Sequence, residues 1–324
     1  MSRLLLYKLL SALIALFLSS VIVFTLVRLA PGDPVKILLG GVGDIPITKT
    51  DAYEKRVAEL RAELGLDDGV MVQYGHWLSR VVRFDFGTSI VTKRSVKEEI
   101  GRRLPATIVL SAAAVVVQTL AGLILGIISA VYAGRFADEA ARGGCVLVAS
   151  IPGFVLGLMG LYLFGVNSSM FRVGADAGFD RLWLPAMTLG LIGVPQLTRI
   201  VRANLLDQFG ECYVLSSISR GLPRRYIVRG ALRNAMRPIV TMIALTLTSL
   251  LGGSVVIENI FAWPGIGTYA MESVLNHDYP VIQAYALLMV SIVILVNLFV
   301  DAVYLLSSAS GEVRRRPERR PGDE

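Results

Sequence analysis

The chain has 324 residues, of which 54% are hydrophobic, and its mean hydropathy is +0.62. These values exclude an ordinary soluble domain and are typical of a protein that crosses the membrane several times. The formal net charge is +7, and the chain contains only two cysteines and two histidines. These low numbers of cysteine and histidine argue against a disulfide framework and against a buried structural metal site. We therefore expect no metal site and no cofactor on this chain.

Six stretches contain no Asp, Glu, Lys, Arg or His and are long enough to be membrane spans, since a transmembrane helix needs about 20 apolar residues. They cover residues 9–27, 104–134, 143–171, 182–198, 238–257 and 279–300. The fourth is the shortest, and it becomes adequate if the flanking Arg181 and Arg199 extend toward the membrane surfaces. The predicted fold class is an all-α polytopic membrane protein with six transmembrane helices.

The distribution of Lys and Arg predicts the orientation, because positive residues in short loops are retained in the cytoplasm. Segment 199–237 contains eight arginines, whereas segment 258–278 contains no Lys or Arg. We therefore place segment 199–237 and both termini in the cytoplasm, and the long first loop, 30–103, outside. The net positive charge is then a cytoplasmic bias with a basic tail, which predicts contact with membrane lipid and no nucleic-acid partner.

The chain divides into four predicted regions. Residues 1–29 form the first span, 30–103 an extracytoplasmic loop, 104–306 a domain with five spans and a cytoplasmic loop at about 204–237, and 307–324 a disordered basic tail. Within the first loop, apolar residues recur at helical spacing in 51–64 and 72–86. The second of these helices carries Tyr74 and Trp77, and either lies on the outer leaflet or packs as a small cap.

Small residues and prolines recur inside the spans. Gly122 and Gly126 are four residues apart, a spacing that lets helix backbones approach closely. Pro152, Pro185 and Pro195 should bend or break the helices that contain them. No span has an ionisable residue at its centre. Proton- or sodium-coupled carriers usually need such a residue, and its absence argues that any coupling energy arrives from elsewhere.

The insert between the fourth and fifth spans is polar and has a helix–turn–helix pattern. Residues 211–219 predict a short helix, Gly221 and Leu222 a turn, and Pro223 the first position of a second helix. Two interpretations remain open. The insert is either a solvated loop whose arginines contact anionic lipid, or a helix presented to a groove on a partner protein.

Four motifs occur in order along the chain: Ala-Pro-Gly-Asp-Pro at 30–34, Arg-Leu-Pro-Ala-Thr at 103–107, Ala-Leu-Arg-Asn at 231–234 and Glu-Asn-Ile-Phe-Ala-Trp-Pro-Gly-Ile-Gly at 258–267. Together they resemble the permease subunits of ATP-binding-cassette (ABC) importers in the dipeptide, oligopeptide and nickel family. Glu211, Ser217 and Gly221 fit the loose pattern of that family's coupling loop. Segments 72–77, 261–264 and 278–283 are most similar to nickel-import permeases. The chain departs from the family at Ser217, Ile218 and Arg220, and its tail lacks the usual Asp-Pro-Arg.

The resemblance implies half of a pore in the cytoplasmic (inner) membrane of a bacterium. The implied partners are a second homologous permease, two ATP-hydrolysing subunits that bind ATP and Mg, and an extracytoplasmic solute-binding protein. This chain is then no enzyme, and it carries no G-x-x-x-x-G-K-[ST] phosphate loop. The expected cargo is nickel, a metal chelate or a di- or oligopeptide, with a short saccharide still open.

The resemblance also implies which residues contact the partners. A helix over 207–219 would dock in an ATPase groove, and the coupling residues are Asp207, Glu211, Tyr213, Leu215, Ser217, Arg220, Gly221, Pro223 and Arg224. Those expected to face the binding protein are Trp77, Phe86, Asn259, Trp263 and Gly265. Trp263-Pro264-Gly265 can equally be a structural turn that returns the chain to the membrane. The alternatives to a permease are a non-transporting membrane scaffold or receptor and an ion-coupled secondary carrier.

Overall fold

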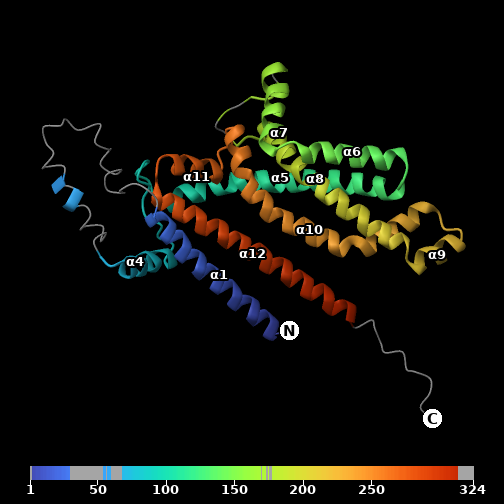
Figure 1. Ribbon diagram of the computed structural model, residues 1–324, viewed down its shortest axis with the longest axis horizontal. Helices are drawn as coiled ribbons and strands as arrows, with labels where there is room; N and C mark the ends of the chain where they lie inside the picture. The colour runs from blue at the N-terminus through green and yellow to red at the C-terminus, as the bar shows by residue number, and fades with distance from the viewer. Residues whose placement is uncertain are drawn as a thin grey trace, which may run out of the picture. The chain divides into compact units, whose positions relative to one another are not determined.

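The computed structural model of the chain (Figure 1) describes residues 2–29, 54–55, 57–59, 68–168, 170–172, 174 and 177–312. In this part of the chain the regular structure is helical apart from one isolated β-bridge between Thr88 and Ser95. The predicted all-α class is therefore confirmed for these residues. The motif at 30–34, most of the helix predicted over 51–64 and the end of the basic tail from residue 313 lie outside the described residues.

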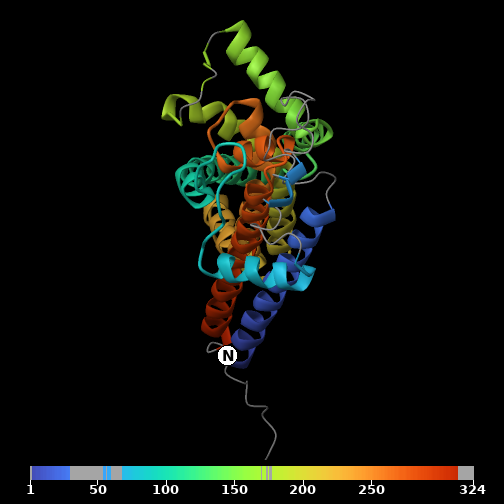
Figure 2. The ribbon, with the colours of Figure 1, turned by 90° about the vertical axis from the view of Figure 1, so that its left-hand side faces the viewer.

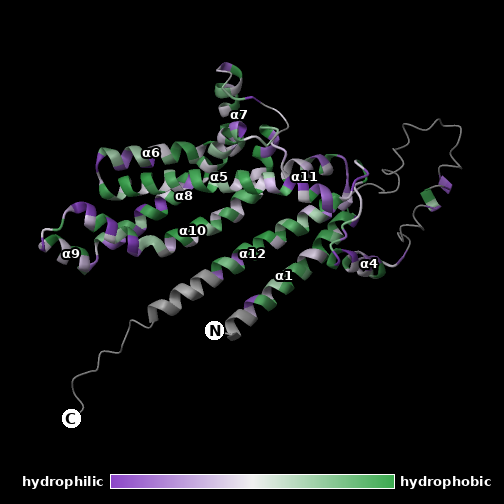
Figure 3. Ribbon diagram, turned by 180° about the vertical axis from the view of Figure 1, so that it is seen from behind, coloured by the Kyte–Doolittle hydropathy of each residue, from purple (hydrophilic) through white to green (hydrophobic). Residues whose placement is uncertain are grey.

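The helices keep the labels of Figure 1. They are α1 (Ser2–Leu29), α4 (Val70–Val82), α5 (Val96–Val131), α6 (Phe136–Ser150), α7 (Gly153–Gly160), the π-helix η2 (Leu161–Asn167), α8 (Phe179–Phe209), α9 (Cys212–Ser219), α10 (Arg224–Ile260), α11 (Ile266–Leu275) and α12 (Tyr279–Glu312). Figure 3 shows hydrophobic residues along α1 and α12 and polar residues gathered around α9.

Among the described residues, five helices are long and apolar enough to cross a membrane. They lie within α1, α5, α8, α10 and α12, and five of the six predicted spans fall largely in them. The predicted third span, 143–171, is not one helix. α6 and segment 153–167 meet at a 97° bend, so the count is six only if this pair is a single span.

The prolines in the spans differ in their effect. The bend of the third predicted span falls at Pro152, which lies between α6 and α7, so the prediction of a break at this proline is confirmed. The same prediction is wrong for a break at Pro185 and Pro195, because α8 continues through both. Neighbouring helices and side chains can satisfy the backbone groups that a proline frees, which makes proline tolerable inside a membrane helix.

The described chain forms two compact units. Unit 1 contains residues 1–114, 152–189 and 251–291, and unit 2 contains residues 115–151, 190–250 and 292–324. In unit 1, α11 and parts of α5 and α12 share a core. Its buried members are Val96, Ile100, Ile266, Tyr269, Val281 and Ala284.

Helix α4 packs on α1 within unit 1. In Figure 2, α4 (cyan) crosses α1 (blue). Ser20 Oγ lies 2.7 Å from Tyr74 Oη, and the Phe24 ring lies 5.4 Å from the Tyr74 ring and 5.5 Å from that of Trp77. Aromatic pairs at these separations stabilise packing beyond the area they bury. The predicted amphipathic helix therefore contacts the first span, and a position on the outer leaflet stays a prediction.

The core of unit 2 joins α5, α8 and α10. Leu197, Val201 and Leu205 recur every four residues on α8 and are fully buried against a matching series on α10. A Cβ atom added to Gly122 would lie 2.8 Å from Leu197 Cδ2, and one added to Gly126 would lie 2.6 Å from Val201 Cβ. The prediction that Gly122 and Gly126 permit close helix packing is confirmed, because a side chain at either position would overlap Leu197 or Val201 of α8.

Candidate functional site

Helix α9 lies at the tip between α8 and α10, where the sequence predicts the coupling loop (Figure 1). The short helix predicted over 211–219 is confirmed to within one residue, with Glu211 at the N-cap. The single docking helix predicted over 207–219 is wrong. α8 ends at Phe209, Glu211 is extended (φ −76°, ψ 146°), and Asp207 therefore belongs to the last turn of a different helix.

One face of α9 is apolar and exposed. Val214 is only 3% exposed and holds the helix against unit 2, whereas Leu215 is 68% exposed and Ile218 56%. Leu222, just beyond the helix, is 42% exposed. Leu215 and Ile218 are three residues apart and lie on the same side of the helix, and Leu222 follows in the turn. We call these three exposed side chains the α9 apolar face. Clustered apolar side chains on a surface mark an interaction site.

The turn after α9 depends on Gly221. Its φ is +69°, a left-handed conformation that residues other than glycine adopt at a free-energy cost. The Gly221 N–H donates to Ile218 O at 2.9 Å, and the Leu222 N–H donates to Ser217 O at 3.2 Å. These two bonds form a Schellman motif, which satisfies carbonyls that the end of a helix leaves free. The sequence prediction of a tight exit at Gly221 is therefore confirmed.

The remaining predicted coupling residues surround α9. Asp207, Glu211, Tyr213, Arg220 and Pro223 are exposed, and Ser217 is half-buried. Pro223 directly precedes α10, which begins one residue later than predicted. Arg224 is exposed but directed at its own chain, because its guanidinium donates to Val131 O and lies 5.5 Å from the centre of the Tyr132 ring. The structure thus brings all nine predicted coupling residues to one end of unit 2.

Unit 1 contains a buried carboxylate that the sequence did not reveal as a structural centre. Glu258, at 0% exposure, accepts hydrogen bonds from Thr107 Oγ1 at 2.7 Å and from the N–H groups of Gly267 (2.8 Å) and Thr268 (3.2 Å). A Cβ atom added to Gly265 would overlap Glu258 Oε2. One side chain at the end of α10 therefore bonds both to α5 and to the N-terminus of α11.

This arrangement changes the expectation for the residues that should face a binding protein. Trp263 is 1% exposed, and its Nε1–H donates to Ala106 O at 2.9 Å. Gly265 is buried as well. The expectation that these two residues are presented to a partner is wrong for this conformation, and the alternative of a structural turn fits. Asn259 is exposed, and Trp77 and Phe86 are half-buried, so for these three the prediction stands.

A second buried carboxylate fastens the loop before α5. Asp278, 1% exposed, accepts from Ser89 Oγ and from the Ile90 N–H at 3.0 Å. Nearby Tyr269 is 3% exposed, and burial raises the pKa of its hydroxyl. The one sequence signal for such sites was an acidic residue directly beside an uncharged stretch, as at Glu258 and Asp278.

Comparison with known proteins identifies the family. Residues 122–310 match the model of the "Binding-protein-dependent transport system inner membrane component", and residues 1–111 match the corresponding N-terminal model. The glutathione transport system permease proteins GsiC of Salmonella choleraesuis (strain SC-B67) and Escherichia coli (strain K12) are each 37% identical over 299 residues. These alignments cover 92% of this chain and 94% of each relative.

The fold has a relative among solved structures. A chain of the inward-facing MetNI methionine ABC transporter superposes with a TM-score of 0.53 at 20% identity, over 63% of this chain and 94% of that one. Together with the apolar helices, these findings define the class, a multi-pass protein of the inner membrane. The chain belongs to the dipeptide, oligopeptide and nickel family of ABC importer permeases. Its similarity to the nickel branch stays a prediction.

Replacement of Glu258 tests the buried carboxylate. Glu258→Ala should lower the free energy of unfolding by about 3 kcal/mol, because it leaves three donors without a partner in a buried site. Glu258→Gln should lower it by about 1 kcal/mol, since the amide oxygen still accepts from the α11 N–H groups while its NH₂ donates to Thr107. Thermal unfolding of the detergent-solubilised chain measures both.

The exposed Glu272 of α11 provides the matched control in the same unit. Glu272→Ala should change the free energy of unfolding by less than about 0.5 kcal/mol. A Glu258→Ala protein as stable as the Glu272→Ala protein would contradict the assigned role.

Proposed function

We propose that this chain forms half of the transmembrane pathway of an ABC importer for short peptides. The support for the importer is the family of the chain, and the support for peptide cargo is its 37% identity to permeases named for glutathione, itself a small peptide. Nickel chelates are the second candidate cargo, supported by the sequence of segments 72–77, 261–264 and 278–283.

The proposed complex contains this chain, a second homologous permease, two ATP-hydrolysing subunits and an extracytoplasmic binding protein. ATP and Mg would be bound by the hydrolysing subunits and not by this chain. The orientation we propose places both termini and α9 in the cytoplasm, because the arginines of segment 199–237 follow the positive-inside rule. The loop 30–103 would then face the binding protein.

The α9 apolar face is the observation that supports docking to an ATPase. Full burial of a leucine or isoleucine side chain contributes about 1.5–3 kcal/mol, so the three side chains can supply several kcal/mol of the binding free energy. Leu215 at 68% exposure has the most apolar surface to gain from a partner. In this proposal, α9 enters a groove on the ATPase subunit, and closure of the ATPase pair moves the helices that flank α9.

A charge on the apolar face should weaken docking. Leu215→Asp should weaken ATPase binding by about tenfold to hundredfold, because it removes an apolar contact and places a carboxylate in a desolvated interface. Co-purification of the ATPase subunits with the tagged permease measures this. Ser216→Asp is the matched control, since Ser216 is also exposed on α9 but lies outside the apolar face. Equal recovery of ATPase with both variants would contradict the docking proposal.

The turn at Gly221 should be needed for coupling. Gly221→Pro requires a φ near −65° where the chain has +69°, and it removes the N–H that donates to Ile218, a local cost of about 3 kcal/mol or more. We expect the spans to assemble and cargo uptake by proteoliposomes to fall to a small fraction of the unchanged protein's. Gly221→Asn, which tolerates a left-handed φ, should retain most uptake. Undiminished uptake by Gly221→Pro would refute the role of this turn.

Cargo-stimulated ATP hydrolysis tests the function itself. The chain is co-expressed with its neighbouring subunits, reconstituted in nanodiscs and supplied with the binding protein plus glutathione, a dipeptide mixture or a nickel–histidine chelate. We expect a peptide to raise the hydrolysis rate. Stimulation by the nickel chelate alone would show that the cargo is a nickel chelate and not a peptide. Failure of any ATPase to co-purify would favour a scaffold or an ion-coupled carrier.

A further inference from the structure

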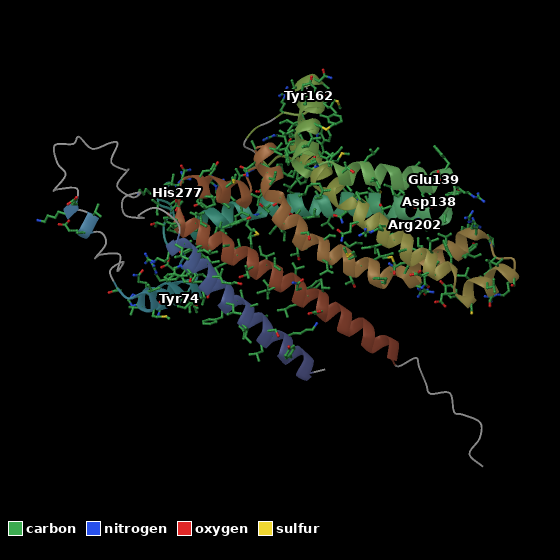
Figure 4. All side chains as sticks on the ribbon, in the orientation of Figure 1. Tyr74, Asp138, Glu139, Tyr162, Arg202 and His277 are labelled. Carbon is green, nitrogen blue, oxygen red and sulfur yellow. The ribbon has the colours of Figure 1, made fainter. Side chains whose placement is uncertain are left out.

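The turn between α5 and α6 is held by a buried carboxylate in unit 2. Asp138 is 1% exposed, and it accepts hydrogen bonds from Ser129 Oγ, from the Gly134 N–H at 3.0 Å and from two nitrogens of Arg202, Nε at 2.9 Å and Nη2 at 2.8 Å. Figure 4 shows Asp138 and Arg202 close together. A bidentate arginine–carboxylate pair fixes both position and orientation, so α8 and the α5–α6 turn are joined with defined geometry.

A second arginine, which follows α9 in the chain, contacts the same turn. Arg224, the first residue of α10, donates to Val131 O at the end of α5 and lies over the Tyr132 ring. Val131 is the last residue of α5, and Tyr132 begins the turn that Asp138 closes. Arg202 precedes α9 in the chain, and Arg224 follows it. The two segments of chain that enter and leave the coupling loop are therefore both fastened to one place.

We propose that Asp138, Arg202 and Arg224 form a positioning frame that couples displacement of α9 to α5 and α6. This proposal rests on the proposed docking of α9 to an ATPase. Without such a frame, a push on α9 could be absorbed by bending where α8 ends and where α10 begins. With it, both flanking helices and the α5–α6 turn move as one body. Arg224 is thus a positioning residue whose guanidinium acts through α5.

The two contacts of the frame differ in strength, which the test can use. Asp138 is fully buried, whereas the Arg202 side chain is 26% exposed, so removal of Arg202 leaves the buried Asp138 carboxylate without its counter-charge. Arg224 is exposed, and its loss leaves only a carbonyl at the protein surface. Arg224→Gln should therefore fold normally even if Asp138→Asn does not.

The experiment measures ATP hydrolysed per cargo molecule imported. The full complex carrying Asp138→Asn, Arg202→Lys or Arg224→Gln is reconstituted in proteoliposomes with the binding protein and the cargo that stimulates the unchanged complex. We expect the Asp138→Asn and Arg224→Gln complexes to assemble and to hydrolyse ATP. Each should consume about five times as much ATP per imported cargo molecule as the unchanged complex, or more. Arg202→Lys keeps the charge without the bidentate geometry, so its ratio should lie between those of Asp138→Asn and the unchanged complex.

Neighbouring exposed residues provide matched controls. Glu139→Gln removes the carboxylate next to Asp138, and Arg225→Gln removes the arginine next to Arg224, and both should leave the ratio unchanged. A frame with only a structural role would lower hydrolysis and import together, with the ratio constant, and that result would overturn the proposal. Normal coupling in an assembled Arg224→Gln complex would also overturn it. If no ATPase subunit co-purifies with the unsubstituted chain, the result would instead refute the proposed function on which the frame depends.

Discussion

A buried polar group in a membrane protein must find its partner inside the protein, because hydrocarbon offers neither donors nor acceptors. This constraint explains where the buried carboxylates of both units lie. In unit 1, Glu258 and Asp278 are buried, and each accepts several hydrogen bonds from loop backbone and hydroxyl groups. In unit 2, Asp138 is buried and accepts two of its bonds from Arg202. The carboxylates therefore lie where irregular chain meets a helix, which is where backbone groups are free to be satisfied.

The choice of partner differs between the two units and suits different tasks. Glu258 accepts from two N–H groups at the start of α11 and from the Thr107 hydroxyl, so backbone donors fix much of its position. The Asp138 pair is formed by two side chains on different helices, and Arg224 adds a contact at the surface. A bidentate pair between side chains fixes the relative position of the two helices that carry them. On physical grounds, unit 1 is therefore built to keep one loop conformation, and unit 2 to hold the helices beside α9 in a fixed geometry.

Composition predicted the spans well because an uncharged stretch of about 20 residues has few alternatives to a membrane helix. It failed at 143–171, because hydropathy does not report direction and Pro152 introduces a 97° bend. α9 and its exit turn were predictable from a local signal, a glycine directly after a short helical segment. The structure uses this glycine in the left-handed conformation that other residues adopt only at a cost. The helix expected over 207–219 missed the break at Gly210 and Glu211, where the backbone bonds are local. The burial of Trp263 was also missed, because it depends on a contact with the distant Ala106 that no local pattern contains.

The described spans give a physical reason why the proposed coupling is mechanical. A proton- or sodium-coupled carrier draws energy through an ionisable residue inside a span, and the six uncharged stretches offer none at their centres. In the proposed importer, energy would instead enter as a displacement of α9, whose apolar face has little purpose in a solvated loop. A displacement is useful only if the chain beside α9 resists bending. Close packing of Gly122 and Gly126 against α8 supplies that stiffness within unit 2, because helices in van der Waals contact cannot slide past one another without a clash. In this proposal the exposed leucine on α9 receives the displacement, and the small residues on α5 keep unit 2 stiff enough to transmit it.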